Sequence, residues 1–103
     1  MHLEERHDGQ TVVVDLHGPV DREQGDFQTL LSRVRGLANH GCTSIVLNVE
    51  ELTRIDSVLV GAIAHAYIST NRAGATLRLQ HVPPSLRQLL AVTKLDRVIE
   101  ILD

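Results

Sequence analysis

The chain has 103 residues and a formal net charge of −3, from 10 basic and 13 acidic side chains. This length suits one domain spanning residues 1–103 and is too short for two. A mildly acidic chain without a basic run excludes nucleic acid as a partner, and no apolar run approaches the roughly 20 residues that insert across a membrane. Hydrophobic residues make up 43% of the chain but aromatic residues only 2%, so we expect an aliphatic core.

The first part of the chain predicts a β-hairpin followed by an amphipathic helix. Polar and apolar residues alternate over 2–7 and again over 12–17, and residues 8–10 form a turn between these two runs. Apolar side chains then recur at helical spacing over 27–38. Gly41 follows this run, where a residue in the left-handed conformation commonly ends a helix.

The rest of the chain predicts three more strands that alternate with two helices. The predicted strands are 43–49, 75–81 and 98–102, and they are recognised by β-branched residues or by alternation. One helix is predicted from about 57 to 72, and another begins at the proline pair 83–84. The side chains expected to be buried along these two helices are Leu59, Ala62, Ile63, Ala66, Leu86, Leu89 and Leu90.

The order of the elements, ββαβαβαβ, predicts an α/β domain with a mixed β-sheet. Nearly every predicted strand keeps one polar face. A parallel sheet that is covered by helices on both sides would instead consist of continuous apolar runs. We therefore expect helices packed mainly on one face of the sheet, with the other face partly exposed to water.

Five segments form an ordered pattern that covers most of the chain. Residues 45–57 combine an apolar strand, a short loop and the dipeptide Asp-Ser at the start of a helix. The other segments are Gly-Pro-Val-Asp at 18–21, Gly-Ala-Thr-Leu-Arg-Leu at 74–79, a Leu-rich helix at 84–90 and Leu-Asp-Arg-Val at 95–98. This pattern resembles the STAS domain of anti-sigma-factor antagonists, and it implies a STAS-like single domain.

The resemblance implies a phosphorylation site, because the serine directly after the aspartate is the phosphoacceptor in that family. Here the pair is Asp56 and Ser57. The chain departs from the family pattern at the next two positions, where Val58 replaces a second hydroxyl residue and Leu59 replaces a glycine. Asp-Ser followed by apolar residues also resembles the STAS scaffold subunits of the bacterial stressosome.

The function implied by the resemblance is that of an anti-sigma factor antagonist. Its unphosphorylated form would bind an anti-sigma factor that is also a serine-protein kinase, freeing a sigma factor, and phosphorylation at Ser57 would end this binding. A stressosome scaffold and an accessory subunit of a lipid transporter remain alternatives, and assembly as a homodimer or within a stressosome is open. The residues expected to contact the partner are Asp21, Asp56, Ser57, Val58, Leu59 and Gly61.

A physical argument supports a switch at Ser57. The N-terminus of a helix has unpaired N–H groups and a partial positive charge, which accommodate a phosphate. A phosphate adds a charge of about −1.5 to −2 beside Asp56 and Asp21, and this charge would repel an acidic group of a docked partner. The simpler alternative is that Ser57 only caps the helix, a contribution of about 1 kcal/mol, and that Asp21 caps the first helix.

Other chemistry is poorly supported by the sequence. Ser57 and His65 are eight residues apart on one predicted helix, a rise of about 12 Å, whereas a general base must approach its nucleophile to about 3 Å. We therefore expect no enzyme activity. The six histidines are scattered and predict neither a metal site nor a cofactor. The lone Cys42 and the charged start at 1–6 predict neither a disulfide nor a signal peptide, which places the protein in the cytoplasm.

Overall fold

The computed structural model describes residues 1–102, and within them it contains five strands, three α-helices and one short 3-10 helix, η1. The predicted order ββαβαβαβ is confirmed. Each helix in this part of the chain is too short or too polar to cross a bilayer. The elements are β1 (His2–Asp8), β2 (Thr11–Gly18), α1 (Asp26–Asn39), β3 (Ser44–Leu52), α2 (Ser57–Arg72), β4 (Thr76–Gln80), α3 (Pro84–Val92), η1 (Leu95–Arg97) and β5 (Glu100–Leu102).

The sheet is mixed and its strands lie in the order β1-β2-β3-β4-β5. β1 and β2 are antiparallel, with Asp8 opposite Thr11, so Gly9 and Gln10 form the predicted hairpin turn. Gly9 has a φ of +64°, a conformation that favours glycine. The other neighbouring pairs are parallel, because a helical connection returns the chain to the same edge of the sheet before each new strand.

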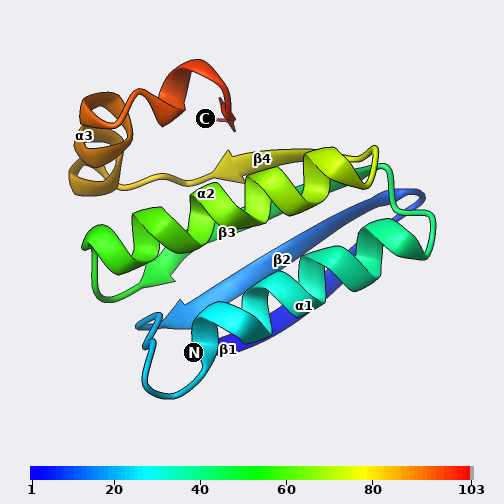
Figure 1. The fold of residues 1–103 in the computed structure, drawn as a ribbon, viewed down its shortest axis with the longest axis horizontal. Coiled ribbons are helices and arrows are strands. Elements are labelled where there is room, and N and C mark those ends of the chain that lie inside the picture. Colours follow the sequence, from blue (N-terminus) through cyan, green and yellow to red (C-terminus); the bar gives the residue numbers. More distant parts are fainter. Residues whose placement is uncertain (103) are drawn as a thin grey trace.

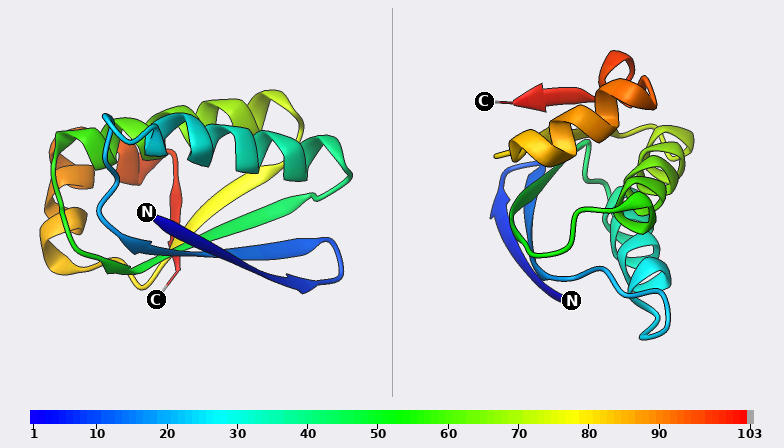
Figure 2. Two further views of the ribbon diagram at one scale, coloured as in Figure 1. Left: turned by 90° about the horizontal axis from the view of Figure 1, so that it is seen from below. Right: turned by 90° about the vertical axis from the view of Figure 1, so that its left-hand side faces the viewer.

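The helices α1 and α2 lie side by side on one face of the sheet, as the two views of Figure 2 show, so the predicted one-sided packing is confirmed. α3 lies near the edge of the sheet at which β4 ends (Figure 1). The core between the two layers is aliphatic, as predicted, although Leu89 of α3 is only partly buried. Side chains with no exposed surface include Val14, Leu30, Ile45, Leu47, Leu59, Ile63 and Leu79.

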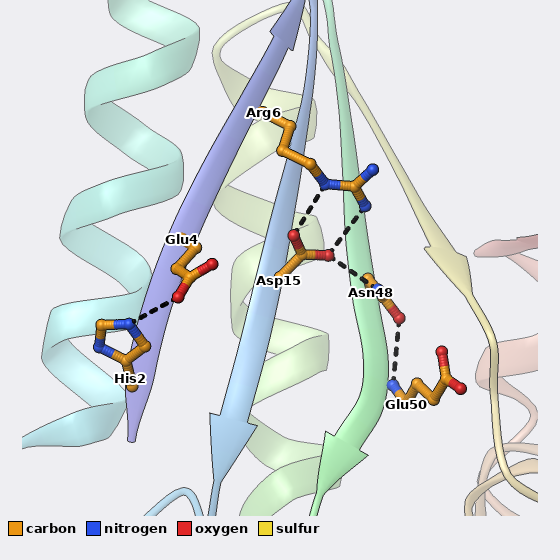
Figure 3. A network of polar contacts seen from close by, with 6 residues as sticks. All are labelled: His2, Glu4, Arg6, Asp15, Asn48 and Glu50. Carbon is orange, nitrogen blue, oxygen red and sulfur yellow. Dashed lines mark hydrogen bonds and ion pairs between the residues drawn. The ribbon is translucent and has the colours of Figure 1, made fainter.

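The other face of the sheet has a network of polar side chains (Figure 3). Arg6 donates two hydrogen bonds to the carboxylate of Asp15, from Nε at 2.8 Å and from Nη2 at 2.9 Å. Asn48 Nδ2 donates to Asp15 Oδ1 at 2.7 Å, and the side-chain Oδ1 of Asn48 accepts from the backbone N–H of Glu50 at 3.2 Å. The hydrogen bonds from Arg6 are the main reason why the pKa of Asp15 lies below its usual range. These polar groups pair with one another in the absence of a covering helix.

Two strand boundaries differ from the sequence prediction by two residues or more. β3 was expected to end at Val49 but continues to Leu52, because Leu52 pairs with Gly18 of β2 and buries its side chain. β5 begins at Glu100, two residues later than predicted, because η1 precedes it and Val98 is 55% exposed. Both boundaries depend on the neighbouring strand or helix, which periodicity within the segment does not reveal.

Candidate functional site

The residues predicted to contact a partner lie at the edge of the sheet where the parallel strands β2 and β3 end. The loop 19–25 follows β2 and the loop 53–56 follows β3, and both lie at the left of Figure 1. Gly18 and Leu52 pair at the ends of the two strands, and the backbone N–H of Thr53 donates to the Gly18 carbonyl at 3.4 Å. The two loops are therefore neighbours, although they are far apart in the sequence.

The start of α2 is organised by Asp56. This residue is the N-cap, with extended backbone angles of φ −146° and ψ −175°, and its Oδ1 accepts a hydrogen bond from the backbone N–H of Leu59 at 3.1 Å. Ser57 is the first residue of the helix, as predicted, and its side chain is exposed. Because Asp56 supplies the cap, the alternative that Ser57 serves as the N-cap is wrong, and the hydroxyl remains accessible to solvent.

The next residues of α2 differ in what they can offer to a partner. Leu59 is fully buried, so the prediction that its side chain belongs to the partner surface is wrong; the side chain fills the core between the helices and the sheet. Val58 is partly buried and packs against the core. Gly61 is partly exposed, and a Cβ at this position would lie 3.9 Å from Cε2 of Phe27. The accessible part of the helix start is therefore Ser57, Val58 and Gly61.

The loop 19–25 holds Asp21 in a turn of its own. The Oδ1 of Asp21 accepts a hydrogen bond from the backbone N–H of Glu23 at 2.9 Å. Asp21 does not cap α1, because the N-cap is Gly25 in the left-handed conformation, with a φ of +76°. The partly exposed carboxylate of Asp21 therefore projects from a loop at the same edge as Ser57.

A buried carboxylate that the sequence analysis missed fixes this loop. Asp26, the first residue of α1, is only 7% exposed. Its Oδ2 accepts a hydrogen bond from the backbone N–H of Asp21 at 2.8 Å and lies 3.3 Å from the amino group of Met1. These contacts could not be anticipated, because an aspartate at the start of a helix is ordinarily an exposed residue that interacts with the helix dipole.

An aromatic cluster adjoins the start of α2 and also escaped prediction. The rings of Phe27 and His65 meet edge to face, with centroids 5.2 Å apart. The guanidinium of Arg22 lies 5.8 Å from the centroid of the Phe27 ring. His65 therefore packs against α1 instead of turning toward Ser57. The cluster joins three separate elements, so no local pattern in the sequence could have indicated it.

The histidines are less scattered than the sequence suggested. His2 and His17 are opposite each other on β1 and β2, and their ring centroids are 5.7 Å apart. The Nε2 of His2 is bonded to the Glu4 carboxylate at 3.1 Å. Within residues 1–102 no group of three or more metal-ligating side chains comes together. This pair belongs to the open face of the sheet, although His17 is next to Gly18 at the end of β2.

Comparison with known sequences and structures gives consistent matches over nearly the whole chain. Residues 3–102 match the model of a family described as "Mlab, STAS domain". A protein of Paenibacillus polymyxa named anti-sigma F factor antagonist is 25% identical over 103 residues, which is 100% of this chain and 87% of that protein.

Several solved structures share the fold. The anti-sigma factor antagonist SpoIIAA in its unphosphorylated form has a TM-score of 0.74 at 19% identity and covers 99% of this chain and 88% of its own. The Bacillus protein SpoIIAA in the phosphorylated form has a TM-score of 0.74 at 19% identity, covering 99% of this chain and 92% of its own. A putative anti-sigma factor antagonist from Thermotoga maritima has a TM-score of 0.83 at 22% identity, covering 98% and 86%.

Proposed function

The chain belongs to the STAS domain family, and from this premise we propose that it is an anti-sigma factor antagonist that phosphorylation of Ser57 switches off. The observation that carries the proposal is the exposed side chain of Ser57 at the start of a helix whose cap is supplied by Asp56. A kinase can reach such a hydroxyl without breaking a capping bond of the fold. The relative from Paenibacillus polymyxa supports the same function.

The chemistry of the switch is a phosphoryl transfer. The Ser57 oxygen would attack the γ-phosphorus of ATP held by the partner kinase, which yields phosphoserine, ADP and the proton of the hydroxyl. The product adds a charge of about −1.5 to −2 at the N-terminus of α2, where the helix dipole favours negative charge. The domain is therefore expected to remain folded after phosphorylation.

The same added charge is expected to oppose binding of the partner. Five acidic residues and only two basic ones, Arg22 and Arg54, lie on the two loops and the end of β3, so the edge that carries Ser57 has a net negative charge. A phosphate there would repel an acidic group of a docked partner, and it would also occupy the space above the helix start. We infer that the unphosphorylated domain binds an anti-sigma factor that is a serine kinase, and that binding frees a sigma factor. The five residues are Asp21, Glu23, Glu50, Glu51 and Asp56.

The proposed partner surface consists of the accessible residues of the two neighbouring loops and the helix start. Asp21 is held by its own turn and by the bond from its N–H to Asp26, so its carboxylate is presented in a fixed position. Gly61 is partly exposed and has no side chain, so a partner could approach the backbone of α2 closely beside Phe27. In this proposal the domain regulates a kinase without enzyme activity of its own and works in the cytoplasm.

The deciding experiment is a pull-down with the candidate anti-sigma kinase in the presence of ADP. Wild type and Ser57→Ala are expected to capture the kinase, whereas Ser57→Asp is expected to capture at least about tenfold less, because the added charge opposes docking. Ser85→Asp is a matched control, since Ser85 is also exposed in the first turn of a helix, α3. Equal capture by Ser57→Asp and wild type would refute the proposal.

The stressosome scaffold is the second candidate, because Val58 and Leu59 depart from the pattern of the antagonists. A scaffold subunit would form a large homo-oligomer or co-assemble with other STAS proteins, whereas the proposed antagonist would form a small complex with its kinase. Size-exclusion chromatography of the purified chain separates the two outcomes. Copurification with a transporter ATPase would instead support the accessory-subunit alternative.

A further inference from the structure

The acidic residues of the chain are distributed unevenly over the fold. None of the 13 acidic residues lies within 27–49 or within 57–95. Across α1, α2 and α3 the only acidic side chain is Asp26, which is buried at the start of α1. The outer surface of the helix layer therefore has no exposed carboxylate, although the chain as a whole is negatively charged.

Two arginines on this layer come together where α1 and α2 end. Arg35 of α1 and Arg72 of α2 line a cleft of about 330 Å³ together with Asn39, Ser69 and Ala73. The Nη2 of Arg35 donates to the hydroxyl of Ser69 at 3.4 Å, so the cleft bridges the two helices. Figure 1 shows the two helix ends side by side at the right, opposite the end of α2 that begins with Ser57.

These two arginines are not neutralised within residues 1–102. Arg6, Arg33 and Arg78 each pair with a carboxylate, whereas no ion pair involves Arg35 or Arg72. The helix dipole stabilises the charge of one of these arginines, because Arg72 is in the last turn of α2. The dipole of α1 does not stabilise Arg35 in the same way, because Arg35 precedes the last turn of that helix, which has no basic residue.

An apolar side chain lies beside the arginines. Ile68 is 44% exposed and is four residues before Arg72, so the two side chains are neighbours on the outer face of α2. Protein interfaces commonly combine an apolar contact with arginine side chains that bind carboxylates through two hydrogen bonds. The surface made of Arg35, Asn39, Ile68, Ser69 and Arg72 is called the arginine cleft below.

We propose that the arginine cleft is a second docking surface, and that its occupant is an acidic protein segment with an apolar side chain between its carboxylates. The carboxylates would pair with Arg35 and Arg72, and the apolar side chain would cover Ile68. An extended anionic surface, such as nucleic acid or a lipid headgroup layer, fits less well, because the net charge of −3 repels it beyond the short range of the cleft.

The proposal goes beyond the switch at Ser57 and does not depend on it. Arg72 is 15 residues from Ser57 along α2, which corresponds to about 22 Å. This distance exceeds the Debye length of about 8 Å at physiological ionic strength. Binding at the arginine cleft should therefore continue when Ser57 is phosphorylated, so that a partner can stay attached while the switch is off.

The test is an NMR titration of the ¹⁵N-labelled protein with a blocked peptide of sequence Glu-Glu-Leu-Glu-Glu-Leu. The expected result is a set of amide shifts confined to residues around Arg35, Ile68 and Arg72. The variant with both Arg35→Glu and Arg72→Glu should bind at least about tenfold more weakly, because two attractive pairs become repulsive. Raising the salt to about 0.15 M should also weaken binding by wild type.

Four controls make the result specific. The double variant Lys94→Glu and Arg97→Glu has the same change in charge near α3, and it should bind the peptide as wild type does. Ser57→Asp should bind the peptide unchanged, which separates this surface from the proposed function. Spectra without peptide show whether each variant is folded, and a peptide with Lys in place of every Glu should cause no shifts.

The proposal would be overturned by any of three results. One is peptide shifts centred on the loops near Ser57, and another is unchanged affinity of the folded Arg35→Glu and Arg72→Glu variant. The third is inorganic phosphate alone producing the same shifts at equal concentration, which would identify a site for a small anion instead of a protein segment.

Discussion

At the scale of single residues, the start of α2 assigns different tasks to two neighbouring side chains. Asp56 accepts the hydrogen bond from Leu59 that caps the helix, and Ser57 presents its side chain to solvent. A residue that caps a helix is costly to modify, because modification removes a bond of the folded state. The separation of the two tasks is what makes Ser57 suitable as a modification site.

Removing the cap should destabilise the domain. We expect Asp56→Ala to lower the free energy of unfolding by about 1 kcal/mol, because an N–H at the start of α2 loses its acceptor. Asp56→Asn should cost much less, since an amide oxygen also caps a helix. Urea unfolding at neutral pH measures both values, and Asp96→Ala, at an exposed residue of η1, is the control. An equal loss in Asp56→Asn and Asp56→Ala would contradict this role.

At the scale of elements, the β1–β2 hairpin should be sensitive to acid. The pKa of Asp15 is lowered, mainly by the hydrogen bonds from Arg6. A carboxyl group with a lowered folded-state pKa stabilises the fold above its ordinary pKa of 3.8, and this contribution is lost as the pH falls through the folded-state value. Wild type should therefore lose more stability than Asp15→Asn between neutral pH and about pH 3.

The difference between the two proteins should be below about 1 kcal/mol, because Arg6 is largely exposed. Urea unfolding of both proteins over this pH range provides the measurement. Glu23→Gln is the control, since Glu23 is exposed and forms no ion pair within residues 1–102. If Asp15→Asn lost as much stability as wild type, the pairing with Arg6 would not contribute at neutral pH.

The helix α2 offers a comparison between stability and binding. Gly61→Ala should raise the free energy of unfolding by about 0.5–1 kcal/mol, because alanine favours a helix and the new Cβ would meet only Phe27, at 3.9 Å. Gly36→Ala in α1 is the matched control, since nothing lies within 4 Å of its Cβ, and it should give a similar gain. Urea unfolding measures both.

The two variants should differ in the pull-down with the kinase. Gly61 belongs to the proposed partner surface, so its alanine variant should capture less kinase although it is more stable. Gly36 is on the other helix, away from the loops that surround Ser57, and its variant should capture kinase as wild type does. Weakened capture by both variants would indicate a general effect of the substitution and would argue against Gly61 as a contact.

At the scale of the whole molecule, the two ends of the helix layer differ in charge. The end that carries Ser57 adjoins an edge with a net negative charge, formed by the loop 19–25 and by Glu50 and Glu51 at the end of β3, and the opposite end carries the arginine cleft. The layered fold produces this division, because both helices run in the same direction over the sheet (Figure 1). A partner can therefore be recognised by opposite charges at the two ends of α1 and α2.

The sequence by itself determined the type and order of the elements. The alternation in 12–17, the helical spacing in 27–38 and the turn at Gly9 are local patterns, and each was confirmed. The polar faces of the strands also predicted correctly that the helices cover one side of the sheet. Local patterns suffice here because the period of hydrophobic residues depends only on the geometry of the strand or helix itself.

Only the tertiary structure decided which of the site residues are accessible and what holds them. The sequence placed Leu59 both in the apolar stripe of its helix and among the partner contacts, and the structure bears out only the first, because the side chain has no exposed surface. The contact of the Met1 amino group with Asp26 and the pairing of Arg35 with Ser69 likewise join residues that no local pattern relates. The physical reason is that burial and pairing depend on which elements become neighbours, and the closure of the fold decides this for segments far apart in the chain.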